Sequence, residues 1–92
     1  MSYRVVWRNR VRNKLHVLAF LARELGDYSD RITRAVDEIE LRLALDPHGE
    51  GESRDATERV LIVHPLSVLY EVFEDQQVVL IYSAVYYPRM RA

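Results

Sequence analysis

The sequence predicts an α+β domain in which an N-terminal strand and an antiparallel two-helix hairpin precede a mainly antiparallel sheet. Two observations carry this prediction. Apolar residues recur at helical spacing between residues 11 and 45, and from residue 59 onward they become nearly continuous and rich in Val, Leu, Ile and Tyr. We expect both helices to pack on one face of the sheet, because the strands supply the only large apolar face that could bury them.

Length and composition limit the chain to a small globular class. Its 92 residues are 49% hydrophobic, which is enough for one core, so we expect a single domain spanning residues 1–92. The absence of cysteine excludes disulfides, cysteine-ligated metals and thiol nucleophiles. No hydrophobic run approaches the roughly 18 residues of a membrane span, and no secretion signal is complete. We therefore expect a cytoplasmic protein that does not enter a membrane.

The N-terminal part of the chain predicts a strand and then a helix. Tyr3–Trp7 is β-branched and aromatic with period-2 alternation, which is typical of a strand. The range Val11–Leu25 has a four, three, four, three spacing of apolar residues, which predicts one helical stripe. Gly26 directly follows, where glycine adopts a left-handed conformation at low cost, so we expect the helix to end there. The stripe consists of Val11, Leu15, Leu18, Ala22 and Leu25.

A second helix is predicted over Ile32–Leu45, ending before Pro47. The preceding segment, Asp27–Asp30, offers several side-chain oxygens as N-caps. On the polar face, Glu38 and Arg42 stand four residues apart in the order that favours an ion pair. Pro and Gly in the segment Pro47–Glu52 predict a loop.

Three antiparallel strands in a meander complete the prediction. Their ranges are Arg59–His64, Leu66–Glu74 and Gln77–Tyr87. They are separated by two turn-like segments, His64-Pro65 and Glu74-Asp75-Gln76. Their apolar runs are nearly continuous, which indicates that the face not covered by the helices is also partly protected, for instance by a partner.

Charge is distributed unevenly along the chain. The formal net charge is −1, yet residues 1–14 carry four arginines and Lys14 without any acid. Lys14 is the only lysine among 13 basic residues, and arginine binds phosphate and carboxylate with a two-pronged fork. A compositional bias of the source genome is the alternative explanation for this preference for arginine over lysine. A basic N-terminal edge favours an acidic partner.

Several segments together resemble the RelE/ParE toxin superfamily of type II toxin–antitoxin systems, which includes plasmid stabilisation proteins. The resemblance covers nearly the whole chain. It depends on the order strand, helix, helix, strands and on the segments GESR at 51–54, RVLIV at 59–63, PLSVLYEV at 65–72 and VVLI at 78–81. This resemblance implies a toxin-like component that binds a cognate antitoxin and inhibits translation at the ribosome or DNA gyrase. The alternative is a catalytically inactive interaction domain of the same fold.

The resemblance also implies a set of candidate catalytic residues. RelE-type members cleave mRNA without a metal, by activating the ribose 2′-hydroxyl and stabilising charge on phosphorus. The residues that could carry this chemistry are Arg54, Arg59, His64, Arg89 and a tyrosine, either Tyr87 or Tyr86. Ser67 and Val60 stand where ribonucleolytic members carry cations, so we expect weak or absent cleavage. We also expect that replacing Arg59 or Arg89 leaves the fold intact, as for a surface arginine.

Plain structural interpretations stay open beside these roles. Arg54 and Arg59 could form ion pairs with neighbouring acids, and the tyrosines could be ordinary strand aromatics. His16 could be a packing residue, and His48 a solvent-exposed loop residue. The histidines lack metal-ligand spacing, so we expect no metal and no cofactor. The acidic second helix would be repelled by phosphates, so we expect no sequence-specific DNA binding by a helix-turn-helix.

Overall fold

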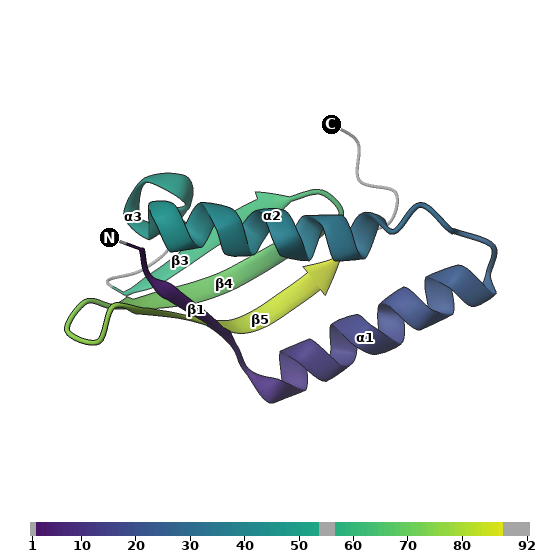
Figure 1. Cartoon of the computed structure of the whole chain (residues 1–92), viewed down its shortest axis with the longest axis horizontal. Coiled ribbons are helices and arrows are strands. Elements are labelled where there is room, and N and C mark those ends of the chain that lie inside the picture. The colour runs from purple at the N-terminus through teal and green to yellow at the C-terminus, as the bar shows by residue number, and fades with distance from the viewer. Residues whose placement is uncertain (1, 54–56, 88–92) are drawn as a thin grey trace.

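In the computed structural model, which describes residues 2–53 and 57–87, two long helices lie on one face of a five-stranded sheet (Figure 1). The helices are α1 (Asn9–Glu24), α2 (Arg31–Leu45) and the single turn α3 (Pro47–Glu50). The strands are β1 (Arg4–Trp7), β2 (Glu52–Ser53), β3 (Glu58–Val63), β4 (Leu66–Phe73) and β5 (Val78–Tyr86). The predicted α+β class and the order of its main elements are confirmed.

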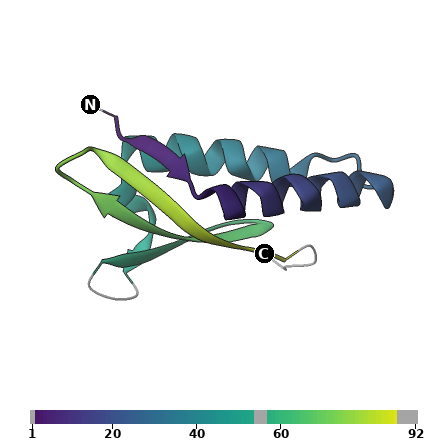
Figure 2. The ribbon, with the colours of Figure 1, turned by 90° about the horizontal axis from the view of Figure 1, so that it is seen from below.

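The described strands have the order β1-β5-β4-β3-β2; the β1–β5 pair is parallel and the other three pairs are antiparallel. The predicted meander therefore forms the centre of the sheet, and the N-terminal strand pairs with the last strand of the chain. The ladder between β4 and β5 is irregular beside Leu69 and Tyr70, where Tyr82 is the extra residue on β5. A β-bulge of this kind bends the strand and increases its twist. Figure 2 shows the twisted sheet from below.

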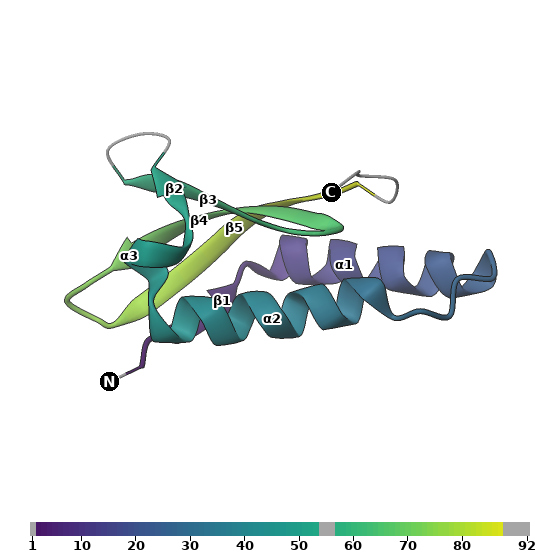
Figure 3. The same ribbon diagram turned by 90° about the horizontal axis from the view of Figure 1, so that it is seen from above.

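The core lies between the sheet and the helices. From α2 it takes Ile32, Ala35, Ile39 and Leu43, and from the sheet the alternate residues of β3, β4 and β5, such as Leu61, Val68 and Ile81. The two helices run antiparallel along this face (Figure 3), as the sequence predicts. The hydroxyl of the fully buried Tyr70 donates to the carbonyl oxygen of Pro47 at 2.6 Å, which ties α3 to the sheet.

The hairpin turn between the helices is held by backbone geometry. Gly26 has a φ of 92°, and its N–H donates to Arg23 while that of Asp27 donates to Ala22. This pair of bonds is a Schellman motif, so the predicted helix end at Gly26 is confirmed. Asp27 is not an N-cap: its carboxylate accepts from the N–H and the hydroxyl of Ser29 and binds Arg31. Asp30 occupies the N-cap position in a left-handed conformation and makes no capping bond from its side chain.

Two other expectations need correction. The predicted loop Pro47–Glu52 contains the helical turn α3 and the start of β2, because the Asp46 carboxylate accepts from the N–H of Gly49 and Pro47 begins the turn. The predicted stripe of α1 is buried only at its start. Val11 and Leu15 are buried, whereas Leu25 is 87% exposed because α1 extends beyond the sheet.

Candidate functional site

Of the predicted catalytic residues that the structure describes, Arg59 lies near the start of β3, and His64 and Tyr87 lie near its end. His64 lies in the turn after this strand, and Tyr87 reaches the same end of the sheet, where its N–H donates to the carbonyl oxygen of Pro65 at 2.7 Å. Both side chains are exposed. Arg59 lies five residues before His64, which corresponds to about 17 Å along a strand. Arg54 and Arg89 lie outside the described residues.

Arg59 contacts the backbone around α3. It pairs with the buried Tyr70 across the β3–β4 ladder, so both side chains lie on the helix-covered face of the sheet. Its Nη2 donates to the carbonyl oxygens of His48 at 2.5 Å and Gly51 at 2.8 Å. The expectation that its removal leaves the fold intact is therefore not supported by this arrangement, because both carbonyls would lose their donor.

The uncovered face of the sheet carries acids. Glu58 on β3 stands directly opposite Glu71 on β4, and the hydroxyl of Tyr82 donates to Glu58 at 2.6 Å. Burial and this hydrogen bond raise the pKa of the Tyr82 phenol to about 12. Within β3, β4 and β5, Arg59 is the only Lys or Arg, and it faces the helices. Two facing carboxylates repel a phosphodiester, so this face is poorly suited to stabilise charge on phosphorus.

A groove of about 310 Å³ lies between α1 and α2. Its lining combines an apolar floor with a polar rim, and includes Trp7, Leu15, Ala19, Ile32 and Val36 as floor and Arg12, His16, Thr33 and Glu40 as rim. The indole N–H of Trp7 donates to Glu40 at 3.0 Å, which fixes one end of this rim. A concave apolar surface with a few polar groups is typical of a binding site.

The helix α1 also exposes apolar side chains that do not line the groove. Val17, Phe20 and Leu21 are about half exposed or more, and Leu25 and Tyr28 follow them at 87% and 71% exposure. The first half of the same helix carries Arg10, Arg12 and Lys14 with no acid. Exposed apolar side chains beside clustered cations are typical of protein-binding surfaces.

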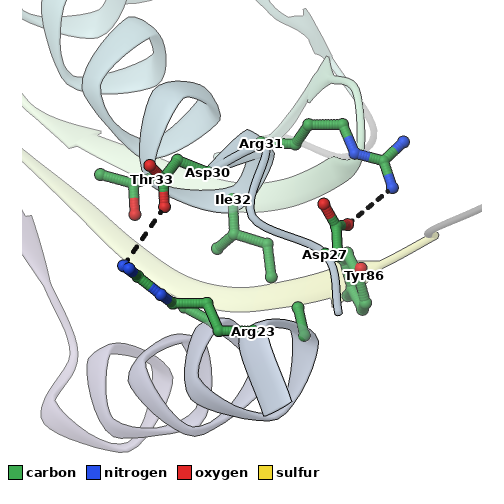
Figure 4. A pocket seen from close by; sticks show the side chains of 9 residues that line it. Arg23, Asp27, Asp30, Arg31, Ile32, Thr33 and Tyr86 are labelled. Carbon is green, nitrogen blue, oxygen red and sulfur yellow. Dashed lines mark hydrogen bonds and ion pairs between the residues drawn. The ribbon is translucent and has the colours of Figure 1, made fainter. Parts of the chain in front are cut away.

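A second, much smaller hollow lies at the hairpin turn (Figure 4). Its charged side chains already pair with each other, Arg31 with Asp27 at 3.0 Å and Arg23 with Asp30 at 3.6 Å. Tyr86 lines this hollow, so its side chain lies on the helix-covered side of the sheet. With a volume of about 20 Å³ the hollow has room for a water molecule but not for a larger ligand.

Sequence reasoning expected an apolar groove beside the helical hairpin, without naming its lining residues, and it missed the acidic face. The alternation of β3 and β4 already places Glu58 and Glu71 on the uncovered side, so this signal was present. The groove depends on how far α1 and α2 stand apart, which no spacing in the sequence reports. His16 is exposed on the groove rim rather than packed, and His48 is exposed as expected, paired with Glu74.

The described residues contain no cluster of three or more His, Asp or Glu side chains able to hold a metal ion. Over the same residues, no helix is long and apolar enough to cross a membrane.

Comparison with known proteins identifies the fold. No protein-family model and no curated sequence matches the chain. Among solved structures, a chain of the toxin–antitoxin complex RelBE2 from Mycobacterium tuberculosis superposes with a TM-score of 0.72 at 21% identity, covering 94% of this chain and 99% of that one. A chain of the archaeal RelE–RelB complex from Pyrococcus horikoshii OT3 gives a TM-score of 0.56 at 18% identity, covering 98% and 100%. The chain therefore has a RelE-like fold, as the resemblance implied.

Proposed function

We propose that the chain is the toxin-like component of a type II toxin–antitoxin module and that the groove between α1 and α2 binds the cognate antitoxin. The observation that carries this proposal is the groove itself, on a fold shared with chains of two toxin–antitoxin complexes. Its apolar floor suits the apolar side of an amphipathic segment, and the cations of α1 suit an acidic one.

The cellular target divides the proposal into two versions. An active toxin would act on ribosome-bound mRNA or on DNA gyrase, whereas an inactive relative would only bind its partner. The acids Glu58 and Glu71 on the uncovered face favour a protein without ribonuclease activity, because they repel the phosphate that the reaction must approach. The catalytic roles of Arg54, Arg59, His64, Tyr87 and Arg89 stay predictions.

The proposal is tested by induced expression in bacteria, alone and together with the protein encoded beside its gene. We expect a stable complex with that neighbour and relief of any growth arrest. Val36→Asp places a charge in the groove and should weaken the complex about tenfold or more, since it removes apolar contact and repels an acidic segment. Leu41→Asp on the exposed side of α2 is the matched control and should change binding less than twofold.

The cellular target, mRNA or DNA gyrase, is determined in the same cells. Primer extension on mRNA reports cleavage within codons, and the accumulation of double-strand breaks reports gyrase poisoning. We expect no codon-specific cleavage. Cleavage that is lost in Arg89→Ala but kept in a folded Tyr28→Ala control would support the ribonuclease version. A protein that is harmless at high expression and binds no neighbour would contradict the whole proposal.

A further inference from the structure

The helix α1 carries a second stripe of side chains on its outer side. Its members follow one another at three, four, three and four residues, and all are exposed: Arg10, Asn13, Val17, Phe20 and Glu24. Because an α-helix has about 3.6 residues per turn, this outer stripe lies away from the buried Val11 and Leu15. None of its members lines the groove. A spacing that alternates between three and four is typical of a helix that pairs with another helix.

The outer stripe has no cover in the described part of the chain. Val17 and Phe20 are 55% and 61% exposed, and Leu21 beside them is 48% exposed. Figure 1 shows α1 at the margin of the molecule, reaching beyond the sheet. Among residues 2–53 and 57–87, Arg10 and Glu24 at the two ends of the stripe form no ion pair. The stripe therefore offers apolar contact in its middle and one available charge at each end.

The two charges are placed symmetrically about Val17. Arg10 lies seven residues before it, and Glu24 lies seven residues after it. When two copies of α1 pack antiparallel with their Val17 side chains facing each other, Arg10 of each copy lies beside Glu24 of the other. The two Arg10 side chains are then about 21 Å apart along the helix axes. That separation exceeds the Debye length of about 8 Å at physiological salt, so their repulsion is screened.

Other occupants match this charge pattern less well. Parallel packing of two copies would place Arg10 against Arg10 and Glu24 against Glu24, and like charges facing each other disfavour a complex. An acidic segment of another protein would gain from Arg10 but would be repelled by Glu24. A surface that binds its own copy about a two-fold axis must be complementary to itself, and the outer stripe meets this requirement.

We propose that the outer stripe of α1 binds a second copy of this chain, as an antiparallel helix pair centred on Val17. Val17, Phe20 and Leu21 of each copy supply the apolar contact, and an Arg10–Glu24 pair closes each end. The interface is one helix wide, so the dimer belongs with weak, transient complexes. This inference does not depend on the proposed function, because the groove lies on another side of α1 and stays open in such a dimer.

Charge reversal tests the pairing in the full chain, by sedimentation velocity over a concentration series up to about 1 mM. We expect a reversible dimer. Arg10→Glu alone and Glu24→Arg alone place like charges at both ends, and each should raise the dissociation constant about tenfold. The double variant, Arg10→Glu with Glu24→Arg, restores both pairs in exchanged order and should return the dissociation constant to within about threefold of the native value.

The apolar middle of the stripe is tested in the same way. Phe20→Ser should raise the dissociation constant about tenfold by removing apolar contact. Leu41→Ser, which replaces a side chain of similar exposure on α2, is the matched control and should leave the dissociation constant unchanged within twofold. Circular dichroism of each variant confirms that the fold is kept.

Cross-linking tests the antiparallel geometry. The chain has no cysteine, so a single introduced cysteine reports where two copies meet. Val17→Cys should cross-link to a dimer with a short bismaleimide. Glu24→Cys should not, because its counterpart lies about 21 Å away, and Leu41→Cys measures random collision.

Several results would overturn the inference. A chain that stays monomeric at the highest concentration would do so, and so would a double charge variant that is no tighter than the single ones. Cross-linking through Glu24→Cys, or no more through Val17→Cys than through Leu41→Cys, would exclude the antiparallel pair.

Discussion

The helices α1 and α2 have similar apolar patterns in the sequence, but they bury different numbers of side chains. Their apolar residues follow the same four-three spacing, yet α2 contributes four buried residues to the core, from Ile32 at 5% to Leu43 at 0% exposure. In α1 only Val11 and Leu15 are buried. Helical periodicity therefore identifies the apolar side of a helix, but it does not show whether the same chain buries that side.

The position of β1 explains this difference. The chain leaves β1 at the outer edge of the sheet and enters α1 after one residue, so α1 begins over the sheet and runs out past its end (Figure 1). The return helix α2 packs against β1 and β3 and leads into α3. The second half of α1 therefore keeps exposed apolar side chains, on a helix that also lines the groove where the proposed function places a partner.

The largest expected effect tests the covered helix. Ile39→Ala removes a fully buried side chain from the core and should lower the free energy of unfolding by about 2–5 kcal/mol. Leu41→Ala, on the exposed side of the same helix, should change it by less than about 0.5 kcal/mol. Urea denaturation of both variants measures the difference. Equal effects would show that α2 is not the core helix.

A smaller effect is expected where α3 is anchored. Tyr70→Phe removes the hydroxyl that donates to the Pro47 carbonyl and leaves that buried acceptor without its partner. The expected loss is about 1–3 kcal/mol in the free energy of unfolding, measured by the same denaturation. Tyr28→Phe, whose parent side chain is 71% exposed, serves as the control. A neutral result at position 70 would mean that water replaces this hydrogen bond.

The turn between α1 and α2 should make a pH-dependent contribution to the stability of the fold. Hydrogen bonds from Ser29, together with that from Arg31, lower the pKa of the Asp27 carboxyl from 3.8 to about 2. A group whose pKa is lower in the folded state stabilises the fold above its ordinary pKa, and this contribution is lost as the pH falls through about 2. Asp27→Asn should therefore flatten the loss of thermal stability between pH 4 and pH 2. An unchanged acid profile in this variant would contradict the assignment.

The smallest expected effect tests the uncovered helix. Phe20→Ser and Leu21→Ser should each change the free energy of unfolding by less than about 0.5 kcal/mol, because these side chains are 61% and 48% exposed. Leu15→Ala, at a buried position of the same helix, should lower the free energy of unfolding by about 2–5 kcal/mol and is the positive control. A loss above about 1 kcal/mol at Phe20 or Leu21 would falsify the contrast between the two helices.

Much of the fold follows from the sequence alone, because local chemistry determines it. Spacing located both helices, Gly26 marked the end of the first, and the change to dense strand residues located the meander. Glu38 and Arg42 form the expected ion pair at 3.0 Å. These features depend on residues close together in the chain, so their patterns are visible without coordinates.

The tertiary structure decided the contacts between distant segments. It paired β1 with β5 in parallel and bound Arg59 to the carbonyl oxygens of His48 and Gly51. It also separated Arg59 from His64 and Tyr87. Among the described residues, it also left apolar side chains in the second half of α1 exposed and paired β1 with only the first half of β5. Periodicity shows which side of a helix or strand is apolar. Which segment packs on that side depends on contacts between residues far apart in the sequence, and a local pattern does not contain these contacts.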